Sequence, residues 1–176
     1  MIKPSINSAS TQRGVGLLEV LIALLVLAIG VLGFAGLQMT ALSKSNDANH
    51  RAAAVLIAQD AIERSELNLS QRDVYLDEDN WGDGAGLLGE APDDECIGGE
   101  TVCEPAELAE WDQNQLAWQA ANQLPGGRIL ASDCEFNTRF TCVIVSWDEQ
   151  DPDDCMDGSG IELGKDSRCV VLEVAR

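Results

Sequence analysis

The longest apolar segment of the chain begins at Val20, and no charged side chain interrupts it before Ser43. The segment predicts a helix long enough to cross a bilayer, since about 20 apolar helical residues span the hydrocarbon core. A single carboxylate, Glu19, stands directly before it. Because a charge at the centre of a membrane helix costs roughly 2.5–3.5 kcal/mol, we expect this acid to have a cationic partner.

The apolar pattern becomes one-sided after Ser43, so residues 44–68 predict an amphipathic continuation of the same helix. One helix over about 17–68 would then combine a membrane-spanning half with a half that belongs to a head. We expect the head to cover one face of the second half, formed by Leu42, Ala48, Ala52, Val55, Leu56 and Ile62.

The remaining residues, 69–176, predict a small head, and the whole chain is of the α+β class. Residues 69–103 are rich in Asp, Glu, Gly and Asn and predict an irregular loop. Residues 105–123 predict a helix, because Pro suits its first turn and the Leu-Pro-Gly-Gly sequence at 124–127 ends it. Runs of β-branched and aromatic residues predict a short antiparallel sheet. Its strands lie at about 127–132, 139–147 and 168–175, with an acidic loop over 148–166.

The apolar N-terminal segment has two simple explanations. A secretory signal peptide has an apolar stretch of about 7–15 residues before its cleavage site, and this segment is longer, although Ala-Leu-Ser at 41–43 could serve as such a site. A plain signal anchor fits the length. In that case Lys3 and Arg13, which precede the span, keep the N-terminus in the cytoplasm.

A third explanation comes from a resemblance. Residues 14–25 read Gly-Val-Gly-Leu-Leu-Glu-Val-Leu-Ile-Ala-Leu-Leu and resemble the type IV prepilin signature. Residues 26–38 and 58–64 are similar to one branch of that family, the PilV-type minor pilins. The chain departs from the common pattern at Val15, where Phe is usual.

The resemblance implies processing at the bacterial inner membrane. Prepilin peptidase would remove the leader, residues 1–14, by cutting after Gly14, and would methylate the new amine of Val15. The helix over residues 15–43 would then cross the membrane once, with the head in the periplasm, and later form part of a filament core. There Glu19 would neutralise an N-terminal amine of its own chain or of a neighbour.

The resemblance also implies partners and a role. A minor pilin of this branch would sit in a priming complex at the filament tip with other minor pilins, the major pilin and a possible tip adhesin. It would support pilus initiation, twitching motility and adhesion. Two alternatives stay open: a minor pseudopilin of a type II secretion system, and a membrane-anchored periplasmic binding module with an uncut N-terminus.

The charge of the chain narrows the partners further. The formal net charge is −19, and loss of the leader leaves 9 basic and 30 acidic side chains. Such a surface repels phosphate backbones, so we expect no binding of nucleic acid.

All six cysteines lie after residue 95, which indicates a disulfide framework in an oxidising compartment. Six thiols allow 15 pairings, and sequence alone does not choose among them. We expect three local loops: Cys96–Cys103, Cys134–Cys142 and Cys155–Cys169. A zinc site is disfavoured, because the chain has no Cys-x-x-Cys pair and its single histidine is far away in sequence.

Two acidic segments could hold calcium outside the EF-hand pattern, one through Asp77, Asp79 and Asp83 and the other through Asp153 and Asp154. The alternative for both is a solvated acidic loop. We find no catalytic constellation and expect neither enzymatic activity nor a cofactor.

Overall fold

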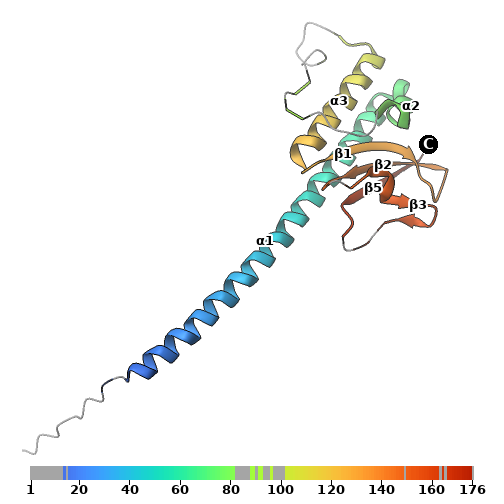
Figure 1. The fold of residues 1–176 in the computed structure, drawn as a ribbon. Coiled ribbons are helices and arrows are strands. Elements are labelled where there is room, and N and C mark those ends of the chain that lie inside the picture. Colours follow the sequence, from blue (N-terminus) through green and yellow to red (C-terminus); the bar gives the residue numbers. More distant parts are fainter. Residues whose placement is uncertain are drawn as a thin grey trace, which may run out of the picture. The chain divides into compact units, whose positions relative to one another are not determined.

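The computed structural model describes residues 14, 16–81, 88–89, 91–92, 96, 102–148, 150–162, 164 and 166–175 (Figure 1). Most of the expected leader, Val15 and Asp83 lie outside the described residues. The chain divides into two compact units, Met1–Ser45 and Asn46–Arg176.

The first unit consists of the N-terminal half of helix α1, which spans Leu17–Leu67. This agrees with the single helix predicted over about 17–68. Its large apolar side chains are exposed from Leu17 to Leu42, and the helix is long and apolar enough to cross a membrane. An exposed apolar surface of this extent is typical of a segment that contacts a membrane or other proteins.

The second half of α1 packs against the head through a narrow stripe of mostly small residues: Ala54, Ile57, Ala58, Ala61 and Ser65. The predicted apolar face is confirmed only in part, because Val55 and Ile62 pack against the main core while the other four residues are exposed. Leu42 and Leu56 are 65% and 66% exposed, Ala48 and Ala52 are exposed, and Val55 and Ile62 are only partly buried. Small side chains let a helix approach its neighbours closely, and the head packs on the alanine stripe of α1 rather than on its more apolar face.

The head contains helix α3, Pro105–Gln123, and a three-stranded antiparallel sheet in the order β1-β2-β5. The strands are β1 (Arg128–Asp133), β2 (Phe140–Ser146) and β5 (Cys169–Ala175), within two residues of the predicted positions. A Cβ at Gly127 would lie 2.0 Å from the carbonyl oxygen of Ala120 at the end of α3, which explains why glycine follows this helix.

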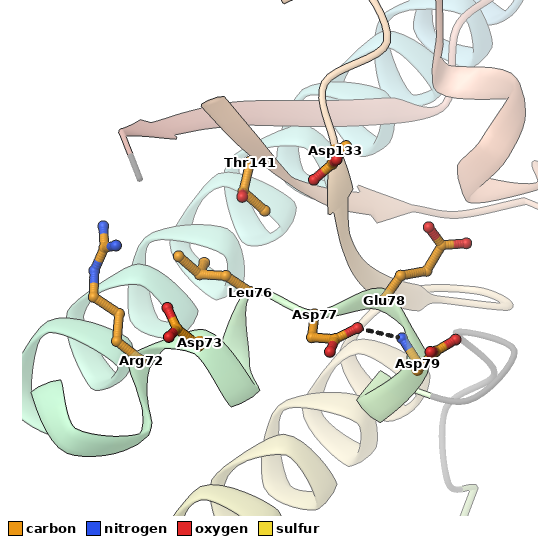
Figure 2. A pocket seen from close by; sticks show the side chains of 8 residues that line it. All are labelled: Arg72, Asp73, Leu76, Asp77, Glu78, Asp79, Asp133 and Thr141. Carbon is orange, nitrogen blue, oxygen red and sulfur yellow. Dashed lines mark hydrogen bonds between the residues drawn. The ribbon is translucent and has the colours of Figure 1, made fainter. Parts of the chain in front are cut away.

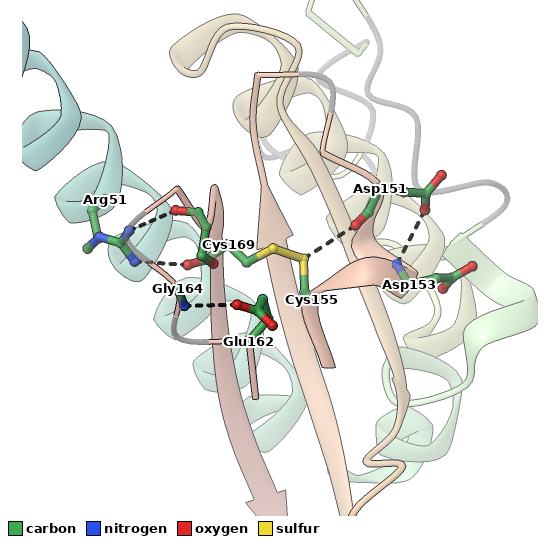
Figure 3. Close-up of a disulfide and its surroundings, with 8 residues drawn as sticks. Arg51, Asp151, Asp153, Cys155, Glu162, Gly164 and Cys169 are labelled. Carbon is green, nitrogen blue, oxygen red and sulfur yellow. Dashed lines mark hydrogen bonds between the residues drawn. A yellow bond between two sulfur atoms is a disulfide. The ribbon is translucent and has the colours of Figure 1, made fainter. Parts of the chain in front are cut away.

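The sheet has a hydrophobic cluster on each face. On one face Val143, Val145 and Trp147 belong to the main core, together with the buried stripe of α1 and with Leu116 of α3. The other face carries a smaller cluster that includes Ile144 and two disulfides, Cys134–Cys142 and Cys155–Cys169. Figure 3 shows the second of these disulfides. The third disulfide is Cys96–Cys103, so the pairing follows the three expected local loops.

Two segments predicted as irregular contain structure. Residues 69–81 form the 3-10 turns η1 (Leu69–Gln71) and η2 (Glu78–Trp81) on either side of the short helix α2 (Arg72–Tyr75). The indole of Trp81 donates to the carbonyl of Tyr75 at 2.8 Å, and both side chains are buried. These two aromatic anchors order a stretch whose polar composition suggested a loop.

The acidic loop after β2 also differs from the prediction. It contains the 3-10 turn η3 (Pro152–Cys155) and a small hairpin of β3 (Met156–Asp157) and β4 (Gly160–Ile161). The carboxylate of Asp157 accepts hydrogen bonds from the backbone of Ser159 and Gly160, and Gly160 has a φ of 145°. The disulfide through Cys155 fixes this segment to the start of β5.

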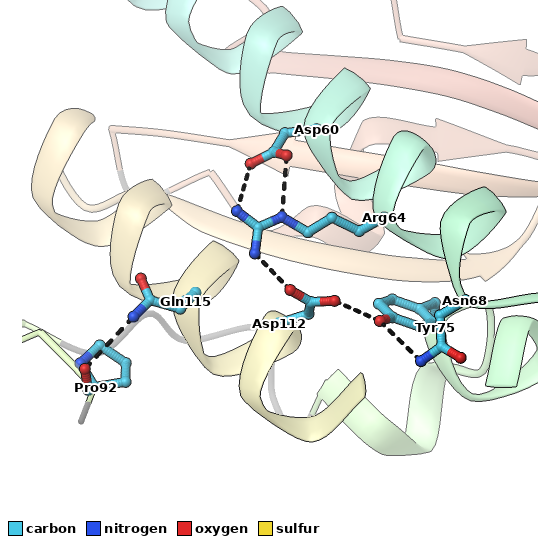
Figure 4. Close-up of polar contacts among 7 residues, drawn as sticks. All are labelled: Asp60, Arg64, Asn68, Tyr75, Pro92, Asp112 and Gln115. Atoms are coloured by element: carbon cyan, nitrogen blue, oxygen red, sulfur yellow. Dashed lines mark hydrogen bonds and ion pairs between the residues drawn. The ribbon is translucent and has the colours of Figure 1, made fainter. Parts of the chain in front are cut away.

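A partly buried polar cluster joins α1, α2 and α3 (Figure 4). Arg64 forms an ion pair with Asp112 at 2.6 Å and a bidentate pair with Asp60. The second oxygen of Asp112 accepts from the hydroxyl of Tyr75 at 2.5 Å, and the amide of Asn68 completes the cluster. Each member satisfies another, as buried polar groups must to avoid a desolvation penalty.

The cluster predicts unequal costs for the same substitution at its two acids. The side chain of Asp112 is 9% exposed and that of Asp60 is 36% exposed. We expect Asp112→Asn to lower the free energy of unfolding by about 1.5–3 kcal/mol, because it removes the charge from two buried hydrogen bonds. Asp60→Asn should cost less than about 1 kcal/mol. Urea unfolding of the full chain in detergent, followed by tryptophan fluorescence, measures both, and equal losses would contradict this account.

The same cluster predicts a loss of stability at alkaline pH. Burial, and then the hydrogen bond to Asp112, raise the pKa of Tyr75 above its usual value of 10.0. Since the folded pKa lies above the unfolded one, this contribution is complete below pH 10 and is lost as the pH rises toward the folded pKa. Tyr75 is the only tyrosine of the chain. The free energy of unfolding should therefore fall less between pH 9 and pH 11 in Tyr75→Phe than in the wild type, and parallel curves would refute this.

Candidate assembly site

The first turn of α1 holds the expected assembly residue, Glu19. The amides of Glu19 and Val20 donate to the carbonyl of Gly16, at 3.0 and 3.3 Å, so the carboxylate lies within the first helical turn. A negative charge there is favoured by the helix dipole. Glu19 is exposed, and in the described part of the chain no cation pairs with it.

The expected cleavage position, Gly14, is also exposed. A Cβ placed on Gly14 or on Gly16 would meet no atom within 4 Å. Nothing inside the described chain therefore requires glycine at position 14. Val15, whose amine is the expected partner of Glu19, lies outside the described residues.

The first half of α1 carries groups that have no partner among the described residues and that could interact with another molecule. It presents an unpaired carboxylate at its start and exposed apolar side chains along its length. In a low-dielectric environment a carboxylate gains most from a single well-placed cation. The arrangement therefore suits packing against other helices.

The head carries an acidic pocket of about 520 Å³ between α2, η2 and the sheet (Figure 2). It is lined by Arg72, Asp73, Leu76, Asp77, Glu78, Asp79, Asp133 and Thr141. One oxygen of Asp77 accepts from the backbone amide of Asp79 at 3.1 Å. Asp83, the third expected ligand on this side, lies outside the described residues.

The second candidate calcium loop is part of η3. There Asp151, rather than Asp153 or Asp154, organises the turn, because its carboxylate accepts from the amide of Asp153 at 3.3 Å. Among the described residues no group of three or more His, Cys, Asp or Glu side chains could hold a metal ion. These aspartates therefore form no assembled ligand set in the part of the chain that the structure describes.

Sequence reasoning missed the arginines of the head. Arg64 holds two acids from different helices, and Arg51 and Arg72 both donate to backbone carbonyls at β5. The spacing of Asp60 and Arg64 by four residues was a usable signal for one pair. Nothing local in the sequence indicated that Arg51 and Arg72 reach the same strand.

Comparison with known proteins adds two family matches. Residues 9–35 match the prokaryotic N-terminal methylation motif, and residues 36–114 match the family described as type IV pilin Tt1218. The searches of curated proteins and of solved structures gave no significant match. The first match covers Gly14 and Glu19, and the second covers the rest of α1, α2 and part of α3.

The matched segments agree with the architecture, since a long N-terminal helix and a small head with an antiparallel sheet fit the α+β pilin fold. The chain is therefore a member of the type IV pilin family.

Proposed function

We propose that the chain is a minor pilin of the PilV type. Prepilin peptidase cuts it after Gly14 and methylates the amine of Val15. The processed chain then resides in the inner membrane with its N-terminus in the cytoplasm and its head in the periplasm. From there it enters a priming complex at the tip of a type IV pilus, and so supports pilus initiation, twitching motility and adhesion.

One observation carries the assembly role: Glu19 lies exposed in the first turn of an apolar helix, within the matched methylation motif, and no cation among the described residues pairs with it. The only new charge that processing creates is the amine of Val15, four residues before it. Pairing of that amine with Glu19 of the same or a neighbouring chain would select one stagger between packed helices.

The minor role and the tip location rest on the resemblance of residues 26–38 and 58–64 to the PilV-type branch. In the second of these segments, Asp60 and Arg64 belong to the partly buried polar cluster that joins the helices of the head. The basic residues Lys3 and Arg13 before the span support a cytoplasmic N-terminus.

The processing step predicts a defined intact mass. Chain extracted from membranes of cells that contain prepilin peptidase should begin at Val15, carry one added methyl group and have six oxidised cysteines. A chain that begins at Met1 would indicate a signal anchor, and one that begins at Lys44 would indicate ordinary secretion. Either result would refute the proposed pathway.

The charge pair predicts a selective assembly defect. Glu19→Ala should be processed like the wild type but enter filaments at least about tenfold less, because loss of one partner of a buried ion pair costs about 3–5 kcal/mol. Glu63→Ala, at an exposed acid of the same helix in the head, is the control and should assemble normally. The measurement is quantitative mass spectrometry of sheared filaments, and normal incorporation of the Glu19 variant would refute the pairing.

Deletion of the gene for this chain distinguishes a minor pilin of a pilus from a minor pseudopilin of a type II secretion system. Loss of twitching and piliation is expected for a minor pilin. Loss of protein secretion with normal motility would instead assign the chain to a type II secretion system.

A further inference from the structure

The strand β5 forms one edge of the sheet, and its backbone groups alternate between β2 and the open side. The amide of Trp147 donates to the carbonyl of Arg168 at 3.0 Å, and β2 pairs antiparallel with β5 in the register Ser146 to Cys169. In an antiparallel ladder the bonded pairs recur every second residue. The backbone groups of Cys169, Val171, Glu173 and Ala175 therefore point away from β2.

Two arginines occupy the ends of this open side. Arg51 of α1 donates to the carbonyls of Ser167 and Cys169, at 2.9 and 3.1 Å (Figure 3). Its guanidinium lies over the ring of Trp147, 5.4 Å from the ring centroid. Arg72 of α2 donates to the carbonyl of Ala175 at 2.5 Å. Both contacts fall on carbonyls that the alternation places on the open side, which confirms the direction of the strand's backbone groups.

The middle of the edge is left without partners. The amides and carbonyls of Val171 and Glu173 form no hydrogen bond among the described residues. Glu173 is exposed, and in the part of the chain that the structure describes its carboxylate has no ion pair. Two donors and two acceptors are thus available between the arginines, over a length that suits about three to five residues of an extended chain.

We propose that this opening in β5 receives an extended segment of a different pilus subunit by β-strand addition. The incoming segment would donate to and accept from the backbone of Val171 and Glu173, and in this way extend the sheet by one strand. The arginines set its register, because they already occupy the carbonyls at both ends. The inference depends on the proposed function only for the source of the partner, another exported subunit.

Charge favours a different subunit over a second copy. Antiparallel pairing of two copies centred on Leu172 would place both Glu173 side chains on the same face as diagonal neighbours, about 7–8 Å apart. Without the leader, each chain also carries 30 acidic and only 9 basic side chains. A partner with a lysine or arginine opposite Glu173 would instead form a favourable cross-strand pair.

Glu173→Pro tests the edge directly. Its amide points away from β2, so proline removes the hydrogen-bond donor of the open side while it keeps the ladder between β2 and β5. Glu173→Ala is the matched control, because it removes the same side chain and keeps the amide. Full-length chain is produced in cells that assemble the pilus and is extracted with detergent, and the other pilins bound to it are identified and quantified by mass spectrometry.

We expect Glu173→Pro to retain at least about tenfold less of the other pilins than Glu173→Ala, since it loses a donor and its ring hinders an adjacent strand. Equal retention by the two variants would overturn strand addition. The intact mass with three disulfides and protected amides at Val170 and Leu172 show whether the proline variant has folded.

Strand addition can also be tested on the wild type, which is needed if the proline variant does not fold. Residue-resolved hydrogen exchange should show a fast amide at Val171 in the isolated chain and a slow one in the assembled complex. An amide that stays fast in the complex refutes strand addition alone. If the wild-type chain is found with no other pilin, the proposed function is refuted as well. If Val171 is protected in a complex that contains only copies of this chain, the choice of a different subunit is refuted.

Discussion

One continuous helix, α1, is exposed and apolar over its first half and packs against the head over its second half, and the other contacts of the head depend on this packing. Over its first half α1 exposes large apolar side chains from Leu17 to Leu42. Over its second half it buries a narrow stripe of alanines and Ile57 against the head. A stripe of small residues provides close approach but little apolar area, so the helix needs additional links to the head. The arginines of α1 supply them.

Those links are polar and lie at both ends of the packed segment. Arg51 binds the backbone before and at the start of β5, and Arg64 binds Asp112 of α3 within a cluster that includes Tyr75. A sheet of three strands offers a modest core, and two of the three disulfides reinforce its second face. The head is thus held by directional contacts whose geometry leaves little freedom between α1 and the sheet.

The described chain has two features that another molecule can complete. Glu19 is a carboxylate without a cation at the start of an apolar helix, and the middle of β5 is a strand edge without a neighbour. The first suits packing between helices, and the second suits contact between heads. Together they are consistent with a pilin that acts only as part of an assembly, since neither group gains its full interaction energy in the isolated chain.

The sequence by itself determined the long helix, the helix after Pro105, the three strands and the residues of the methylation motif, because each depends on local pattern: an unbroken apolar run, a proline followed later by glycines, or β-branched residues. It did not determine which face of residues 46–67 is buried, that Tyr75 and Trp81 order the stretch after α1, or that Arg51 and Arg72 meet the same strand. These features join residues up to 118 positions apart. Only the tertiary structure decides such contacts, because they depend on how closely the elements approach and on which backbone groups the sheet leaves open.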